Sequence, residues 1–198
     1  MATTRLEIQA DPVLDRYWNA IALAGAQARP IIARAVNRTV DASYTQVVKA
    51  LVKQTSAPRK VLTSQIRKHK AAHKGFEAVE GSLSARGRPL PLSVFRPRQF
   101  APGVKAKVWG RRQLFRHAFG APGGPPALVA RLGGHVFVRV GRERLPIHQL
   151  YGPSIPKEML KDESAKAFNA TVADVLPRRI EHELFRIVPG AMPGPASP

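Results

Sequence analysis

Hydrophobic residues recur at helical spacing over much of the first third of the chain. One such pattern covers residues 11–23, and a broader one covers residues 31–54. Pro30 lies between them. Because proline is tolerated in the first turn of a helix, one kinked helix and two separate helices are both allowed. A short basic helix is predicted over residues 59–71, before Gly75 ends it.

A second helical region is predicted near the other end of the chain. Pro156 begins a short helical turn, and a longer pattern then covers residues 162–187. Asp162 or Ser164 is expected to cap this last helix, because both side chains can accept from free amides of a first turn. Pro177 lies inside the pattern and should kink or divide the helix.

Between these helical regions the hydrophobic period changes to two, which is the spacing of strands. Strand patterns occupy residues 76–87, 90–95, 103–110 and 134–141. The clearest is GVKAKVWG at 103–110, which alternates Val, Ala and Val with Lys, Lys and Trp. Helices at both ends around central strands predict an α+β fold with a mostly antiparallel sheet.

Proline and glycine concentrate in three segments that interrupt these patterns. GAPGGPPALVARLGG, residues 120–134, predicts a flexible loop. LPIHQLYGPSIPKEM, residues 145–159, predicts a rigid connector from a strand to a short helix. Residues 189–198 predict a tail that is disordered unless a partner binds it. We therefore expect one α+β domain over residues 1–188, followed by that tail.

The charge of the chain is strongly positive, with 32 Lys and Arg residues against 13 Asp and Glu residues. Two long stretches, residues 42–76 and 81–142, contain no acid. A chain this basic repels itself unless it meets a polyanion or an acidic surface, so its middle should face a negatively charged partner. The candidates for that role are Arg59, Lys60, Arg67, Lys68, Lys70, Lys74, Arg111 and Arg112.

No pattern in the sequence points to catalysis. The chain has no cysteine, which excludes disulfides and thiolate metal sites. His69 and His73 would share a helix face, but there is no third ligand at a diagnostic spacing and their neighbours are basic. Scarce carboxylates disfavour a hydrolase or two-metal nuclease, and no serine elbow is present. We predict no enzymatic activity, no catalytic residue, no metal and no cofactor.

The sequence also predicts where the protein is made. Its first residues, MATTRLEIQA, lack the basic and apolar regions of a secretory signal. No stretch approaches the ~18 consecutive apolar residues of a membrane-spanning helix. We expect synthesis in the cytoplasm and no membrane partner.

Aromatic residues scattered through the basic middle allow two interpretations. Their rings can stack on nucleic-acid bases while Arg and Lys contact phosphates, or they can form the core of the sheet. The core interpretation is favoured, and no sequence-reading motif is present. These residues are Phe95, Phe100, Trp109, Phe115, Phe119 and Phe137.

Three motifs occur together in the second half of the chain. An F-R-P-R segment leads into a strand that ends in V-W-G, an H-V-F-V-R strand follows, and R-L-P-I-x-x-L-Y-G-P-S-I-P comes last. In this combination the sequence resembles the minor tail protein Z family of lambda-like tailed bacteriophages, over roughly residues 25–188. The Gly/Pro-rich residues 120–134 look like an insertion relative to that family.

The resemblance implies a structural protein of the virion, found in the neck region of the tail and made in the host cytoplasm during assembly. A family member would form a homohexameric ring at the head-proximal end of the tail and complete it. Its partners would be other copies of itself, tail terminator or tail tube proteins and head–tail connector proteins. Genomic DNA would pass through its lumen. No catalytic residue is implied.

The connector then has two interpretations: it reaches a neighbouring subunit at a fixed angle, or it joins a strand to a helix within one subunit. Its prolines would lower the entropy lost on assembly, and Tyr151 can bury its ring while its hydroxyl stays paired or in contact with water. The lumen is assigned to the cluster from Arg59 to Lys74. The connector signature comprises Trp109, Leu145, Pro146, Leu150, Tyr151, Gly152, Pro153, Ser154 and Pro156.

The same charge pattern also allows a second class of function. The surplus of positive charge and the acid-free stretches also suit a stand-alone nucleic-acid-binding protein of the RNA or DNA chaperone type. Assembly would distinguish the two, because rings or binding to tail tubes favour the first and a salt-sensitive monomer favours the second.

Overall fold

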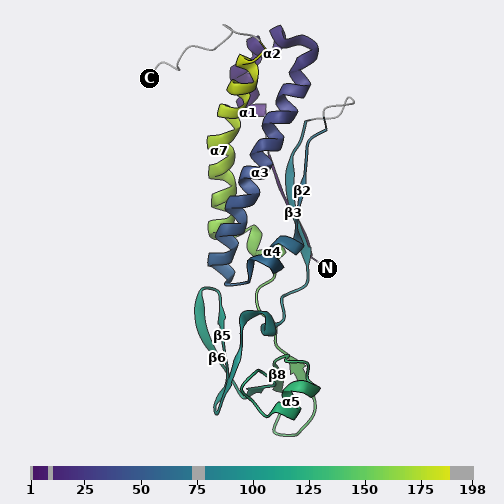
Figure 1. Cartoon of the computed structure of the whole chain (residues 1–198), viewed down its shortest axis with the longest axis vertical. Coiled ribbons are helices and arrows are strands. Elements are labelled where there is room, and N and C mark those ends of the chain that lie inside the picture. Colours follow the sequence, from purple (N-terminus) through teal and green to yellow (C-terminus); the bar gives the residue numbers. More distant parts are fainter. Residues whose placement is uncertain (1, 9–10, 73–78, 188–198) are drawn as a thin grey trace.

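The computed structural model describes residues 2–8, 11–72 and 79–187, and it is an elongated molecule with two parts (Figure 1). The helical part comprises the described residues up to Gly87 together with residues 154–187. The distal part comprises residues 88–153 and lies beyond one end of the long helices (Figure 1). One continuous cluster of buried hydrophobic side chains extends through both parts.

Two long helices pack lengthwise and form the frame of the helical part. They are α3 (Ala28–Thr55) and α7 (Asp162–Phe185), and at 28 residues α3 is ~42 Å long. Pro30 occupies the first turn of α3, where its missing amide costs no helical hydrogen bond. The chain before it forms a bent run of short helices: α1 (Asp11–Leu14), η1 (Asp15–Tyr17), α2 (Trp18–Ala24) and η2 (Gly25–Gln27).

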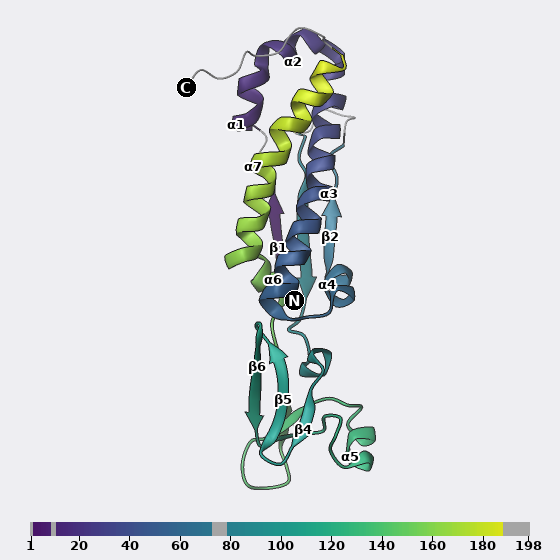
Figure 2. The same ribbon diagram turned by 60° about the vertical axis from the view of Figure 1, so that its left-hand side comes forward.

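A three-stranded antiparallel sheet lies alongside these helices. Its order is β1 (Ala2–Glu7), β3 (Ser82–Gly87) and β2 (Ile66–His69), with β3 in the middle (Figure 2). The short helix α4 (Arg59–Gln65) connects α3 to β2. At Gly81 an added Cβ would lie 2.6 Å from Cγ1 of Val36, so the chain leading into β3 rests directly on α3.

The distal part contains two more three-stranded antiparallel sheets. One has the order β4 (Arg98–Phe100), β5 (Gly103–Val108), β6 (Arg111–Arg116). The other has the order β7 (Ala118–Phe119), β8 (Phe137–Arg139), β9 (Ile147–Gln149). The 3₁₀ turn η3 (Leu92–Phe95) precedes them, α5 (Pro126–Arg131) separates β7 from β8, and α6 (Ile155–Met159) returns the chain to the helical part.

The two chain segments that cross between the parts pair with each other. The amide of Gly152 donates to the carbonyl of Leu90 at 2.7 Å, and the amide of Leu90 donates to Pro153 at 3.0 Å. The amide of Leu92 also donates to Leu150 at 3.0 Å. The connector is therefore one strand of a short backbone ladder, which restrains the distal part more than a single linker would.

A second contact, at the tip of the β5–β6 hairpin, fixes the distal part to the end of α3. The amide of Trp109 donates to the carbonyl of Thr55 at 3.2 Å, and the amide of Gly110 donates to Oγ of Ser56 at 3.1 Å. Trp109 and Gly110 have φ of 48° and 74°, as a two-residue hairpin turn requires. That conformation is unfavourable for tryptophan, and the contacts with α3 offset its cost.

Side-chain hydrogen bonds extend this second contact to α6 and α7. The indole Nε1 of Trp109 donates to Oε1 of Glu158 at 3.3 Å, and Nε2 of Gln54 donates to Oε2 of Glu158 at 2.8 Å. Oγ of Ser164 donates to Oε1 of Gln54 at 2.7 Å. We call Gln54, Trp109, Glu158 and Ser164 the joint, since they connect four elements where the two parts meet.

The predicted α+β class is confirmed, and the strand pairings in the described part of the chain are all antiparallel. Several predicted boundaries are wrong. The basic helix expected over 59–71 ends at Gln65, where the chain turns into β2, and the strand expected over 90–95 is the 3₁₀ turn η3. The loop expected over 120–134 contains α5. Trp109 and Gly110 form the hairpin turn, so the strand expected over 103–110 ends two residues earlier, at Val108.

The last helix also differs from its prediction. Of the two outcomes expected at Pro177, a kink or a division, the division does not occur, because α7 is continuous from Asp162 to Phe185. Its N-cap is Lys161, with no capping side chain, and the hydroxyl of Ser164 bonds within the joint instead. The predicted tail, Lys74 and the start of the strand expected at residue 76 lie outside the described residues.

A buried carboxylate couples α3 to the C-terminal end of α7. Glu183 is buried, and its Oε2 accepts from Nε of Arg34 at 2.7 Å. Arg38 and Arg186 lie 4.0 and 3.6 Å from the same carboxylate. Removing Glu183 would therefore leave closely spaced guanidinium groups without their counterion.

Tyr17 forms a further contact with α7 and should affect stability at high pH. Burial, followed by its 2.5 Å hydrogen bond to Glu181, raises the pKa of Tyr17 from 10.0 to about 12. The unfolded chain releases this proton near pH 10, whereas the folded protein keeps it to higher pH, so stability should fall between these values. When urea unfolding is measured from pH 9 to 11.5, the free energy of unfolding of Tyr17→Phe should decrease less than that of the wild type. Tyr151→Phe, which changes an exposed tyrosine, should retain the wild-type profile.

Gly152 should tolerate no side chain, because a Cβ there would lie 2.8 Å from Cε2 of Phe95. Gly152→Ala should lower the free energy of unfolding by ~1–3 kcal/mol through overpacking. In a Phe95→Leu background, Gly152→Ala should lower the free energy of unfolding by less than it does in the wild type. Gly141→Ala is the control, since nothing lies within 4 Å of that position. An equal loss in both backgrounds of residue 95 would contradict the packing explanation.

Candidate functional site: a basic groove between the two parts

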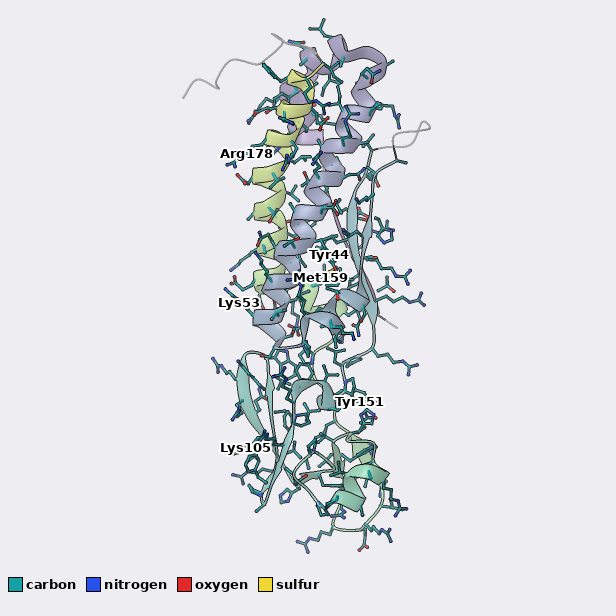
Figure 3. The ribbon with its side chains drawn as sticks, viewed as in Figure 1. Tyr44, Lys53, Lys105, Tyr151, Met159 and Arg178 are labelled. Atoms are coloured by element: carbon teal, nitrogen blue, oxygen red, sulfur yellow. The ribbon has the colours of Figure 1, made fainter. Side chains whose placement is uncertain are left out.

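A groove of about 1020 Å³ lies where the two parts meet. Its upper wall is the end of α3 and the start of α4, and its lower wall is η3 and the β4–β5–β6 sheet. Figure 3 shows Lys53 at the lower end of α3 and Lys105 on the strand below it. Apolar side chains, among them Val52, Val94 and Phe95, form part of the lining.

Among the residues that the structure describes, seven basic side chains and no acid line this groove. They are Lys53, Arg59, Arg96, Arg98, Lys105, Lys107 and Arg112, which we call the groove cations. All seven are exposed. Within the part of the chain that the structure describes, none of them forms an ion pair.

Strand alternation explains why so many cations gather here. In β5, Val104, Ala106 and Val108 are buried on one face, so Lys105 and Lys107 project from the other. The neighbouring strands add cations directly opposite, because Lys105 pairs with Arg98 of β4 and Lys107 pairs with Arg112 of β6. Like charges in such positions repel each other and destabilise the sheet. The groove face therefore favours a bound anion.

One aromatic ring is exposed among these cations. Phe100 of β4 keeps 42% of its surface accessible, and Nζ of Lys105 lies 4.8 Å from its ring centroid. The other aromatic residues of the basic middle divide between the two interpretations, packing in the core and exposure for stacking on bases. Phe95 is buried, Phe115, Phe119 and Phe137 are partly buried, and Trp109 is exposed at the hairpin tip.

The structure separates the cations that the sequence offered as candidates for facing a negatively charged partner. Arg59 and Arg112 belong to the groove, whereas Lys60, Arg67 and Arg111 are exposed outside its lining. Lys68 and Lys70 lie 2.6 and 3.1 Å from the carboxylate of Asp41, and the hydrogen bond from Lys68 lowers the pKa of Asp41.

Five groove cations were missed by sequence reasoning. Lys53, Arg96, Arg98, Lys105 and Lys107 come from three separate segments, and only the fold brings them together. The alternation in residues 103–110 already placed the two lysines of β5 on one face. It could not show that α3 would end above that face.

The connector signature has a buried side and an exposed side. Pro153, Ser154 and Pro156 are buried, and Gly152 packs against Phe95. Leu145 and Tyr151 are 67% and 52% exposed, Leu150 is partly buried, and Pro146 is exposed and follows a cis peptide bond. Within the single chain Tyr151 does not bury its ring, and its hydroxyl donates to Oε1 of Gln149 at 3.2 Å. The segment joins β9 to α6 within one chain, as one of its two interpretations required.

The histidine pair considered for a metal does not share a helix face. His69 lies in β2, where its Nε2 is 2.7 Å from Oγ of Ser84, and His73 is outside the described residues. Among the described residues there is no cluster of three or more His, Asp or Glu side chains suited to a metal. Over those same residues, no helix has the length and apolar character needed to cross a bilayer.

No protein-family model, curated protein or solved structure matches this chain. The resemblance to the minor tail protein Z family therefore stays a prediction, and the function has to be argued from the geometry.

Reversing one charge of the groove should stabilise the fold. Lys107→Glu would face Arg112 across the strands and replace a repulsive pair by an attractive one. Urea unfolding at low salt should show a gain of ~0.2–1 kcal/mol that shrinks as salt is added. Lys68→Glu is the opposite control, because it would place a second carboxylate beside Asp41 and lower stability. A loss of stability in Lys107→Glu would show that Lys107 has a structural partner.

Proposed function

We propose that the protein is a structural subunit of a tailed phage that forms a closed ring at the head-proximal end of the tail. In this role it completes the tail and contacts tail terminator or tube proteins on one side and head–tail connector proteins on the other. It acts by packing against copies of itself and performs no catalysis.

The observation that carries this proposal is the two-sided connector. Its buried side holds the distal part on the helical part through the backbone ladder with Leu90 and Leu92. Its other side leaves Leu145 and Tyr151 exposed on the same short segment. A ring subunit needs both properties, because it must keep a fixed shape and present apolar surface to the next copy.

The distribution of charge supports the same proposal. The distal part contains twelve Lys and Arg residues but a single acid, Glu143. Copies of such a surface repel one another unless a polyanion lies between them. A ring around DNA, or one seated on acidic tail proteins, supplies that neutralisation.

The groove also favours the second function class, a stand-alone nucleic-acid-binding protein. Seven cations without an ion-pair partner among the described residues, beside an exposed ring, would serve that role in a monomer. The two classes differ in assembly, so the oligomeric state decides between them.

The proposed ring can be tested by light scattering and negative-stain microscopy of the purified protein, alone and mixed with purified tail tubes of a lambda-like phage. We expect closed rings in solution or on tube ends. The double variant Leu145→Asp, Tyr151→Ala should abolish them while it keeps the wild-type circular dichroism spectrum, since both side chains are exposed.

Leu23→Asp is the matched control for this experiment, because Leu23 is 71% exposed in the helical part and should leave assembly intact. A protein that stays monomeric and does not bind tube ends would overturn the proposal and leave the nucleic-acid-binding alternative. Rings that persist in the double variant would instead show that the connector is not part of the contact between subunits.

A further inference from the structure

We propose that the groove binds the phosphodiester backbone of a nucleic acid, with Phe100 available to stack on a base. This goes beyond the ring, because every groove residue belongs to one chain and the site is complete in a monomer. It also names the particular cations that bind the ligand, which the net charge of the chain cannot do.

The spacing of the cations suits a repeated anion better than a single one. Lys105 and Lys107 are two residues apart on one strand, which places them ~6.8 Å from each other. Arg98 and Arg112 flank them on the neighbouring strands, ~5 Å away between Cβ atoms. One small anion would neutralise one of these pairs, whereas a chain of phosphates can neutralise both.

The upper wall adds cations from outside the sheet. Lys53 at the end of α3 and Arg59 at the start of α4 line the same groove, and Arg96 lies beside η3. A backbone that enters the groove is thus contacted from two sides. The guanidinium groups can each form two parallel hydrogen bonds to a phosphate, which an ammonium group cannot.

The exposed ring of Phe100 distinguishes a nucleic acid from an acidic peptide. An acidic peptide would use the cations but leave the ring without a partner. A single-stranded nucleic acid uses both, because a base can stack on the ring once Lys105 leaves it for a phosphate. The geometry therefore favours the nucleic acid.

The test is fluorescence anisotropy with three labelled probes: a twenty-nucleotide oligothymidylate, a twenty-base-pair duplex and polyglutamate of similar length. Lys107→Glu should weaken oligothymidylate binding about tenfold at low salt and reduce the slope of log affinity against log salt by ~1. Lys166→Glu is the matched control, because it makes the same change in net charge on α7, outside the groove. Its effect should be much smaller.

Phe100→Leu separates the two sources of phosphodiester. If a single strand occupies the groove, this variant loses about tenfold in oligothymidylate affinity and almost none for the duplex. If the duplex binds more tightly and Phe100→Leu changes neither affinity, the groove holds a duplex backbone, and the proposal stands without stacking.

Two results would overturn the proposal. One is equal weakening in Lys107→Glu and Lys166→Glu, which would show that binding follows net charge and not the groove. The other is polyglutamate binding as tightly as oligothymidylate and with the same dependence on Lys107, which would assign the groove to an acidic protein. Both measurements can be made on the double variant Leu145→Asp, Tyr151→Ala, which should form no rings, so their outcome is independent of whether rings form.

Discussion

The structure depends on the contact between the tip of the β5–β6 hairpin and the end of α3. The amides of Trp109 and Gly110 bond to the last residues of that helix, and the joint ties the same point to α6 and α7. The groove exists because of this contact, since one of its walls belongs to the helical part and the other to the distal part. A small change in the angle between the parts would separate Lys53 from the cations of the sheet.

The fold class could be predicted from hydrophobic periodicity because the long elements carry strong patterns. Residues 31–54 repeat at helical spacing, and α3 covers them all. Short elements were predicted less well. In residues 66–69 only Ile66 is buried, so the alternation of a strand is absent there. These four residues were therefore predicted as the end of a basic helix. Tertiary pairing with β3 decided their conformation.

The candidate site was harder to predict because no single segment contains it. Net charge directed attention to the acid-free middle, but it could not separate cations that are neutralised from those that are not. Lys68 and Lys70 are close to Arg59 in sequence, yet they pair with Asp41, an acid of α3. The groove cations have no such neighbour among the described residues, and opposite strands hold two pairs of them in register. A surface arranged in this way favours ligand binding at the expense of stability.

The place where the chain leaves the helical part is also the place where it returns. Leu90 and Gly152 are hydrogen-bonded neighbours although sixty-one residues separate them in the sequence. In topology the distal part is thus an insertion with adjacent entry and exit points, an arrangement that proteins tolerate well. Insertions, deletions or replacements between those points need not change the course of the two long helices. The sequence of the distal part can therefore change as its binding partner changes.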